Sequence, residues 1–393
     1  MHKIKTHHRH PQGRIFSWMV LLLGFSVGLM LPILPNFIKS IVETDAAVSL
    51  FYSLMAVAMF AGAIISTYVF KKVPRTSITK WAFAMSGVVS LAFILTTDVV
   101  ELSIINTLRV WMRMLLIMAL ALFVRDFTSK SNLGKEEGYF YFFHNIGHFI
   151  GPLIGGFVAT YMGYETVFIL SSLAFFVAFF YFYHTHIIQQ HPAIQKCDET
   201  SDHRIFSNIK KFFKNKERSK AYFVTVVYMM WISFKRIYVP LYIIFEGYKD
   251  NMTGLVMALG IIPCILLEVK IGEYADKKGV RKPMSYGFYI IGLSLIAIFF
   301  SPYPMLNFLI IILANIGGAF IEPLQGYYIL ENMSEDEEDD LYGIFMTTDP
   351  VGHFIIPAVG ALTLLFLPMK ALFLIFGIFA ILSGFFTWAT VKR

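Results

Sequence analysis

The chain has 393 residues, of which 57% are hydrophobic and only 15% are charged, and its mean hydropathy is +0.64. A water-soluble protein of this length cannot bury so much apolar side chain, so the composition indicates a protein that crosses a membrane several times. The formal net charge of +7 does not indicate nucleic-acid binding, because the basic residues gather in short loops between apolar stretches.

Twelve apolar stretches follow one another along the chain, and each is long enough to cross a bilayer. An apolar core of about 30 Å takes roughly 20 residues of helix. We expect the spans at Ile15–Ile38, Val48–Phe70, Trp81–Thr97, Leu102–Val124, Tyr139–Tyr161, Val167–His184, Ala221–Phe245, Thr253–Ile271, Met284–Phe300, Met305–Leu330, Leu341–Leu367 and Ala371–Val391. The predicted fold class is therefore an all-α integral membrane protein.

The stretches divide into two halves around one long polar segment. Residues 15–186 and 221–393 each hold six spans, residues 1–14 form an N-terminal tail, and residues 187–220 form a basic linker. The linker sequence Lys-Lys-Phe-Phe-Lys at 210–214 fits an amphipathic helix on an anionic inner leaflet and, equally, a solvated connection. We expect two pseudo-symmetric six-helix bundles.

Lysine and arginine residues predict the orientation. If both termini are cytoplasmic, Lys39, Lys249 and Lys370 are the only basic residues in the loops on the other side. Positively charged loops stay in the cytoplasm, so we expect a multi-pass protein of the plasma (inner) membrane with both termini cytoplasmic. The first stretch lacks a small-residue cleavage site and is expected to remain as a signal anchor.

The two halves share a repeated sequence. Residues 147–155 read Gly-His-Phe-Ile-Gly-Pro-Leu-Ile-Gly, and residues 352–360 read Gly-His-Phe-Ile-Ile-Pro-Ala-Val-Gly, about half the chain apart. Leu34-Pro35 and Val239-Pro240 keep the same register. Repeats on this scale in an apolar chain are typical of duplicated transporters, whose substrate site lies between the halves.

Twelve spans in a six-plus-six repeat with a cytoplasmic central loop resemble the architecture of the major facilitator superfamily. Residues 272–282, Gly-Glu-Tyr-Ala-Asp-Lys-Lys-Gly-Val-Arg-Lys, are similar to its loop motif, and the resemblance implies a gate. The residues that match this gating motif are Gly272, Asp276, Lys277, Gly279, Arg281 and Lys282. Residues 28–35, Gly-Leu-Met-Leu-Pro-Ile-Leu-Pro, resemble the proline-ended first helix of its exporters.

The fifth stretch is similar to a signature of the family's antiporters. The matching residues are Gly147, Gly151, Pro152, Gly155 and Gly156. Glycines permit close approach of another helix, and a proline removes a backbone hydrogen bond and bends the segment. Ordinary glycine-rich packing is the alternative interpretation.

The first-half loop departs from the family pattern, with Ser66 and Phe70 in place of Gly272 and Asp276. Only its basic residues match, so the lock expected on that half is in doubt. The acidic run at residues 335–340 lies on the same predicted side. We hypothesise that it pairs with the basic residues at 71, 72 and 75; a solvated charge run is the alternative.

Five ionisable residues inside the spans are candidates for the substrate site, because charge in a membrane is costly and usually functional. They are Arg109, Arg113, Lys235, Arg236 and Glu322. The resemblance implies that the fourth, seventh and tenth helices, which carry them, line a central cavity. Four cations against one anion favour an anionic or amphipathic small molecule as substrate. Alternatively, Lys235 or Arg236 reaches the outer interface, while Arg109 or Arg113 pairs with Glu322 as a structural bridge.

Coupled transport needs a group that binds and releases a proton or another ion as the site alternates. Glu322 is the first candidate, followed by Asp349 and His144; Glu268 is a further one. For His148, as for its repeat equivalent His353, we expect a hydrogen bond between helices instead.

Enzymatic chemistry is not indicated. The sequence contains no nucleotide-binding glycine loop, no paired metal-ligand motif and no nucleophile elbow. Cys197 and Cys264 lie in segments too different to suggest a disulfide. We therefore expect no enzyme, metal or cofactor, and a monomer whose partners are its substrate, a coupling ion and membrane lipids.

These observations predict a secondary transporter of the superfamily type. We expect alternating access and proton-coupled export of a small organic solute through a cavity of positive character. Two alternatives stay open: an anion-selective uptake carrier, and a non-transporting membrane protein of the same fold that acts as an assembly factor, sensor or lipid-handling scaffold.

Overall fold

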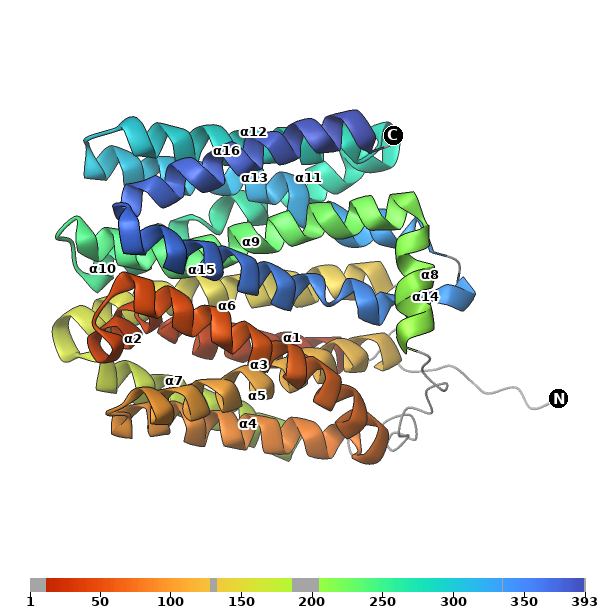
Figure 1. Cartoon of the computed structure of the whole chain (residues 1–393). Coiled ribbons are helices and arrows are strands. Elements are labelled where there is room, and N and C mark those ends of the chain that lie inside the picture. Colours follow the sequence, from red (N-terminus) through yellow and green to blue (C-terminus); the bar gives the residue numbers. More distant parts are fainter. Residues whose placement is uncertain (1–11, 128–132, 186–204, 334, 392–393) are drawn as a thin grey trace.

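The computed structural model describes residues 12–127, 133–185, 205–333 and 335–391. Most of the predicted tail, residues 187–204 of the predicted linker, and Cys197 lie outside these ranges. Long helices lie side by side along one direction, and the short helix α8 (Ile205–Lys214) crosses one end of them (Figure 1). We call this end the α8 end and the opposite one the far end.

The helices of the first half follow the predicted stretches. They are α1 (Gln12–Met30), α2 (Leu34–Val42), α3 (Asp45–Lys72), α4 (Arg75–Ala92), the short 3-10 helix η1 (Phe93–Leu95), α5 (Val99–Phe127), α6 (Leu133–Met162) and α7 (Tyr164–His184). The first predicted stretch is divided into α1 and α2 by a turn at 31–33. Pro32 lies in this turn and Pro35 lies in the first turn of α2, since neither proline can donate the backbone hydrogen bond that a continuous helix needs.

The second half repeats this arrangement after α8. Its helices are α9 (Lys216–Phe245), α10 (Asp250–Leu259), α11 (Ile262–Lys278), α12 (Arg281–Phe300), α13 (Pro304–Leu330), α14 (Glu335–Phe345), α15 (Thr348–Phe366) and α16 (Met369–Thr390). The predicted eighth and eleventh stretches are each divided in two, at Gly260–Ile261 and at Met346–Thr347. Pro263 follows the first of these breaks directly.

The protein is an all-helical membrane protein. Ten helical segments in the described ranges are long and apolar enough to cross a membrane. Helices α6 and α9, with 30 residues each, run alongside them in the same bundle (Figure 1). Together these twelve segments correspond to the twelve predicted stretches.

One aromatic core lies within the first half, and a second, centred on α9, also takes in residues of the first half. In the first half Phe16, Phe83 and Phe123 are buried between α1, α4 and α5. In the second half α9 is the central helix, and Trp231 and Phe234 are fully buried. A polar side chain in the middle of α9 therefore has protein neighbours on nearly every side.

Helix α8 is fixed to the second half. Phe212 is fully buried and packs edge-on against Tyr222 of α9, while the amine of Lys211 lies 3.0 Å from a carboxylate oxygen of Glu337 on α14. Phe213 stays 43% exposed although it also contacts the Tyr222 ring. The described part of the linker is thus a helix, with one phenylalanine turned toward protein.

The hydrogen bonds that join the two halves lie toward the far end. Helices α2 and α10 are at this end (Figure 1), and α10 contacts α6 of the first half. Nearer the middle, Tyr238 of α9 donates to Ser49 of α3 at 3.1 Å, and Ser53 donates to the Phe354 carbonyl of α15 at 3.4 Å. The halves are therefore closed against each other at the far end.

Candidate functional site

The five ionisable residues predicted for the substrate site lie several turns from the ends of their helices, and all are half-buried. They are Arg109 and Arg113 on α5, Lys235 and Arg236 on α9, and Glu322 on α13. They separate into two groups. The arginines lie between the halves, whereas Lys235 and Glu322 have partners inside the second half.

The three arginines come together from both halves. Arg113 of α5 lies within electrostatic range of Arg236 on α9 and of Arg109, and Arg109 is also within range of Arg236. Arg109 donates to Asn106 on its own helix at 3.0 Å. In the described part of the chain no carboxylate lies at ion-pair distance from any of the three. The result is a concentration of positive charge between the halves.

Arg236 also belongs to a short chain of polar contacts with α15. Its Nη1 atom lies 3.4 Å from His353 Nε2, and His353 Nδ1 lies 3.0 Å from the Asp349 carboxylate. Asp349 is within electrostatic range of both Arg236 and Arg113. The predicted coupling residue Asp349 thus faces the arginines, and the expected interhelical contact of His353 is made to Arg236.

The predicted coupling residue His144 lies beside His148 on α6, with ring centroids 4.3 Å apart. Both rings are within electrostatic range of Arg113 and Arg236. His148 is buried beside Gly24 of α1, and its Nδ1 atom has no hydrogen-bond partner among the described residues. The interhelical hydrogen bond expected for His148 is therefore not made by this atom.

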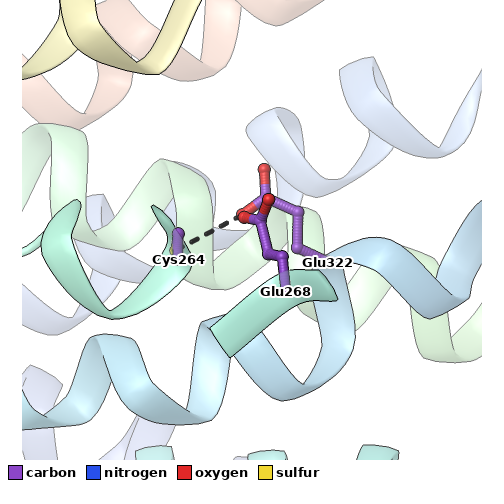
Figure 2. A group of neighbouring side chains, drawn as sticks. All are labelled: Cys264, Glu268 and Glu322. Carbon is purple, nitrogen blue, oxygen red and sulfur yellow. Dashed lines mark hydrogen bonds between the residues drawn. The ribbon is translucent and has the colours of Figure 1, made fainter. Parts of the chain in front are cut away.

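Glu322 has different neighbours. Tyr228 of α9 donates to its carboxylate at 2.6 Å, and the Cys264 thiol of α11 donates to the same oxygen at 3.7 Å. Figure 2 shows Glu268, one turn after Cys264, with its carboxylate turned toward that of Glu322. One ligand atom from each of Cys264, Glu268 and Glu322 lies within 4.8 Å of the others. Two carboxylates therefore meet inside the second half.

Lys235 points away from its neighbour Arg236. Its amine donates to Asn315 of α13 at 3.2 Å, and it lies within electrostatic range of Glu268. The contacts differ from the structural alternatives: Lys235 donates to α13, Arg236 contacts His353, and Glu322 accepts from a tyrosine.

The predicted gating motif lies at the end of α11 and the beginning of α12. Gly279 has a φ of +82°, a conformation that favours glycine and ends the helix. Asp276, Lys277 and Lys282 are exposed, and the space beside Gly272 is open. Arg281 stacks over the Trp388 ring at 5.7 Å. The motif therefore makes its turn, and through Arg281 it contacts α16 of its own half.

The antiporter-like motif packs against two helices. Gly147, Gly151 and Gly155 lie against the α1 backbone, where a Cβ atom at Gly151 would be 2.7 Å from Gly28 Cα. Gly156 faces the second half instead and touches the α10 backbone at Asp250 and Gly254. The motif therefore includes a close contact between the halves.

One side chain of the acidic run, that of Glu337, is described. It accepts hydrogen bonds from Arg218 of α9 and Lys211 of α8. These partners belong to the second half and its linker, so the pairing of Glu337 differs from the hypothesised contact with residues 71, 72 and 75. The side chains of Lys71 and of the other acidic residues lie outside the described set.

Sequence reasoning did not single out Tyr228, nor Asp250, which is 8% exposed at the beginning of α10. Tyr228 is one of many aromatic residues in a span. An aspartate in the first turn of a helix is common, because its charge favours the helix N-terminus. The sequence carried no signal that separates these two residues from ordinary ones.

Comparison with known proteins agrees with the predicted transporter family. The chain matches the Major Facilitator Superfamily over residues 16–262 and 223–393. It is 22% identical to the class B tetracycline resistance protein of Escherichia coli over 338 residues, covering 81% of this chain and 80% of that protein. It is 23% identical to multidrug resistance protein 2 of Bacillus subtilis (strain 168) over 363 residues, covering 87% and 86%.

A solved structure supports the fold. The chain superposes on a peptide transporter POT in complex with sulfate with a TM-score of 0.77 and 16% identity, covering 98% of this chain and 95% of that one. At this level of identity the likeness concerns the arrangement of helices.

Proposed function

Because this chain belongs to the Major Facilitator Superfamily and is a secondary transporter, we propose that it exports a small anionic or amphipathic solute in exchange for protons. The transport would proceed by alternating access, in which the two six-helix halves open in turn to the two sides of the membrane. The observation that carries the substrate class is the meeting of Arg109, Arg113 and Arg236 between the halves.

The three guanidinium groups support an anionic substrate. Like charges in surroundings of low dielectric repel each other, and an anion placed among them relieves this repulsion. Guanidinium groups also bind carboxylates and phosphates with paired hydrogen bonds. Since Arg113 and Arg236 come from different halves, an anion bound to both would draw the halves together.

The pair Glu268 and Glu322 supports the coupling to protons. Two carboxylates a few ångströms apart in an apolar interior do not both stay ionised, so the pair is suited to hold one proton between them. Tyr228 donates to a carboxylate oxygen of Glu322, and Arg236 lies within electrostatic range of the same residue. Movement of Arg236 with the substrate would change how tightly the pair holds its proton.

Export is supported by the two related resistance proteins, since a membrane transporter gives resistance to a compound when it removes that compound from the cell. The membrane orientation predicted from the charged loops agrees with export. With the α8 end in the cytoplasm, the closed far end faces outward, and the substrate would enter from the cytoplasm.

The proposal is tested by flux in proteoliposomes that contain the full chain and a pH-sensitive dye. A gradient of each member of a panel of organic anions and cations is imposed, and internal pH is recorded. We expect anions to move protons opposite to themselves and cations to give no signal; protons that move with the anion would indicate uptake instead. Glu322→Gln should abolish the proton signal, and Glu101→Gln, at an exposed position in the first turn of α5, should leave it unchanged. A wild-type protein that moves no proton with any member of the panel contradicts the proposal.

A further inference from the structure

One carboxylate of the second half has both of its oxygen atoms bound by the first half. Asp250 is the first residue of α10, and its Oδ1 accepts a hydrogen bond from the Asn36 amide of α2 at 2.8 Å. Its Oδ2 accepts one from the Tyr164 hydroxyl of α7 at 3.1 Å. The side chain is nearly buried, so these bonds are shielded from water.

The surrounding contacts also cross between the halves. The Asn251 backbone N–H donates to the Thr160 hydroxyl of α6 at 2.8 Å. One turn further on, Gly254 lies against Gly156, and a Cβ atom there would be 3.1 Å from the Gly156 Cα. The polar contacts of Asp250 therefore lie next to a glycine contact that allows the backbones of α6 and α10 to touch.

Other aspartates at this end are bound within their own half. Asp98 accepts from the backbone N–H groups of Val100 and Glu101, and Asp45 pairs with Lys39 at 2.8 Å. Such contacts are unchanged when two rigid halves rock against each other. The contacts of Asp250 cannot persist, because Asn36 and Tyr164 move with the first half and α10 moves with the second.

We propose that Asp250 is a positioning residue of the transport cycle, a latch that holds the far end closed and that must release Asn36 and Tyr164 before this end opens. This inference rests on the proposed alternating access. A charged acceptor bound by two donors in a buried contact favours the closed arrangement. In the open arrangement, water forms hydrogen bonds with the carboxylate, the amide and the hydroxyl instead. Removing the carboxylate leaves the amide and the hydroxyl unpaired only when the far end is closed.

The latch is tested by distance measurement between spin labels in the full chain, in a background with Cys197→Ser and Cys264→Ser. One label pair, at Met162→Cys and Tyr303→Cys, reports the far end, and a second, at Lys72→Cys and Lys282→Cys, reports the α8 end; all four positions are exposed. For Asp250→Ala we expect the ratio of open to closed far end to rise about tenfold, with the α8-end distance shortening in step. Asp98→Ala is the matched control and should change neither distance.

Two milder variants guard against a protein that fails to fold. Tyr164→Phe and Asn36→Ala each remove one donor and should each open the far end partly. Combined with Asp250→Ala, neither should open the far end further, since the acceptor is already gone and the second change removes a donor that it left unpaired. Unchanged far-end distances in Asp250→Ala, or equal effects of Asp250→Ala and Asp98→Ala, would overturn the latch. A shift in distances without any solute flux in the wild type supports the latch and contradicts the proposed function.

Discussion

Glu337 of α14 accepts a charged hydrogen bond from Arg218 of α9, and its second oxygen lies 3.0 Å from the Lys211 amine of α8. The linker helix, the first helix of the second half and the acidic segment are thereby joined at one carboxylate. The hydrogen bond from Lys211 and the charge of Arg218 lower the pKa of Glu337 from its ordinary value of 4.5 to about 2.

This pairing predicts how the attachment of α8 depends on pH. A lowered pKa means that the folded arrangement favours the ionised carboxylate, so its contribution is fully present above pH 4.5 and is lost as pH falls toward 2. A spin label at the exposed Ser207 of α8 should keep its mobility from pH 7 to pH 5 and become more mobile below pH 4. In the Glu337→Gln variant, the same spin label should be mobile at every pH. Equal pH profiles of this variant and the wild type would refute the role of Glu337.

The arginine cluster predicts a selective loss of anion binding. Arg113→Gln or Arg236→Gln removes one of three guanidinium groups and should raise the KM for an anionic solute about tenfold or more. Lys249→Gln removes a positive charge from an exposed loop at the far end and should leave the KM within about twofold. Initial rates of uptake into everted vesicles measure both. If the loop variant weakens binding as much as the interior ones, the general charge of the protein and not the cluster attracts the solute.

The helical architecture could be predicted from the sequence because apolar length and loop charge are each set by a single stretch of chain. The breaks after Gly260 and at 346–347 were not expected, since a proline such as Pro263 is also tolerated inside membrane helices. The hydrogen-bond partners of the site residues were harder to predict from the sequence. Lys235 and Arg236 are neighbours in sequence, yet one bonds to Asn315 and the other to His353, because successive residues of a helix point about 100° apart.

The partners of Glu322 illustrate the same limit. A helix position indicates that a carboxylate lies inside the bundle, but its neighbours depend on how far α11 and α13 are rotated toward each other. Cys264 and Glu268 lie on α11, which begins after the break at Gly260–Ile261, and both lie close to Glu322. No periodicity in a single helix contains this information.

The carboxylate pair predicts coupled effects of mutation. If the two groups share one proton, as proposed, Glu268→Gln and Glu322→Gln should each abolish proton movement, and the double variant should be no worse than either one. Flux of the anion down its own gradient should persist in all three. A chelator added to the wild type should have no effect on transport. Inhibition by the chelator would indicate instead that Cys264 and the two glutamates bind a metal ion.

The contact between Gly156 and Gly254 predicts that a single methyl group at the far end impairs transport. A Cβ atom at position 254 would collide with the Pro152 carbonyl oxygen, which is backbone and cannot rotate away, so Gly254→Ala should keep α6 and α10 apart. Gly326 of α13 has open space beside it, so Gly326→Ala adds the same methyl group without a collision. We expect the first variant to reduce transport about tenfold and the second to reduce it less than twofold, both at equal expression and thermal stability.

The same collision predicts a change in distance. Because it acts only when the far end is closed, Gly254→Ala should also lengthen the distance between labels at Met162 and Tyr303. Impaired flux with an unchanged distance would mean that the methyl group acts on the bundle in some other way than by holding the far end open.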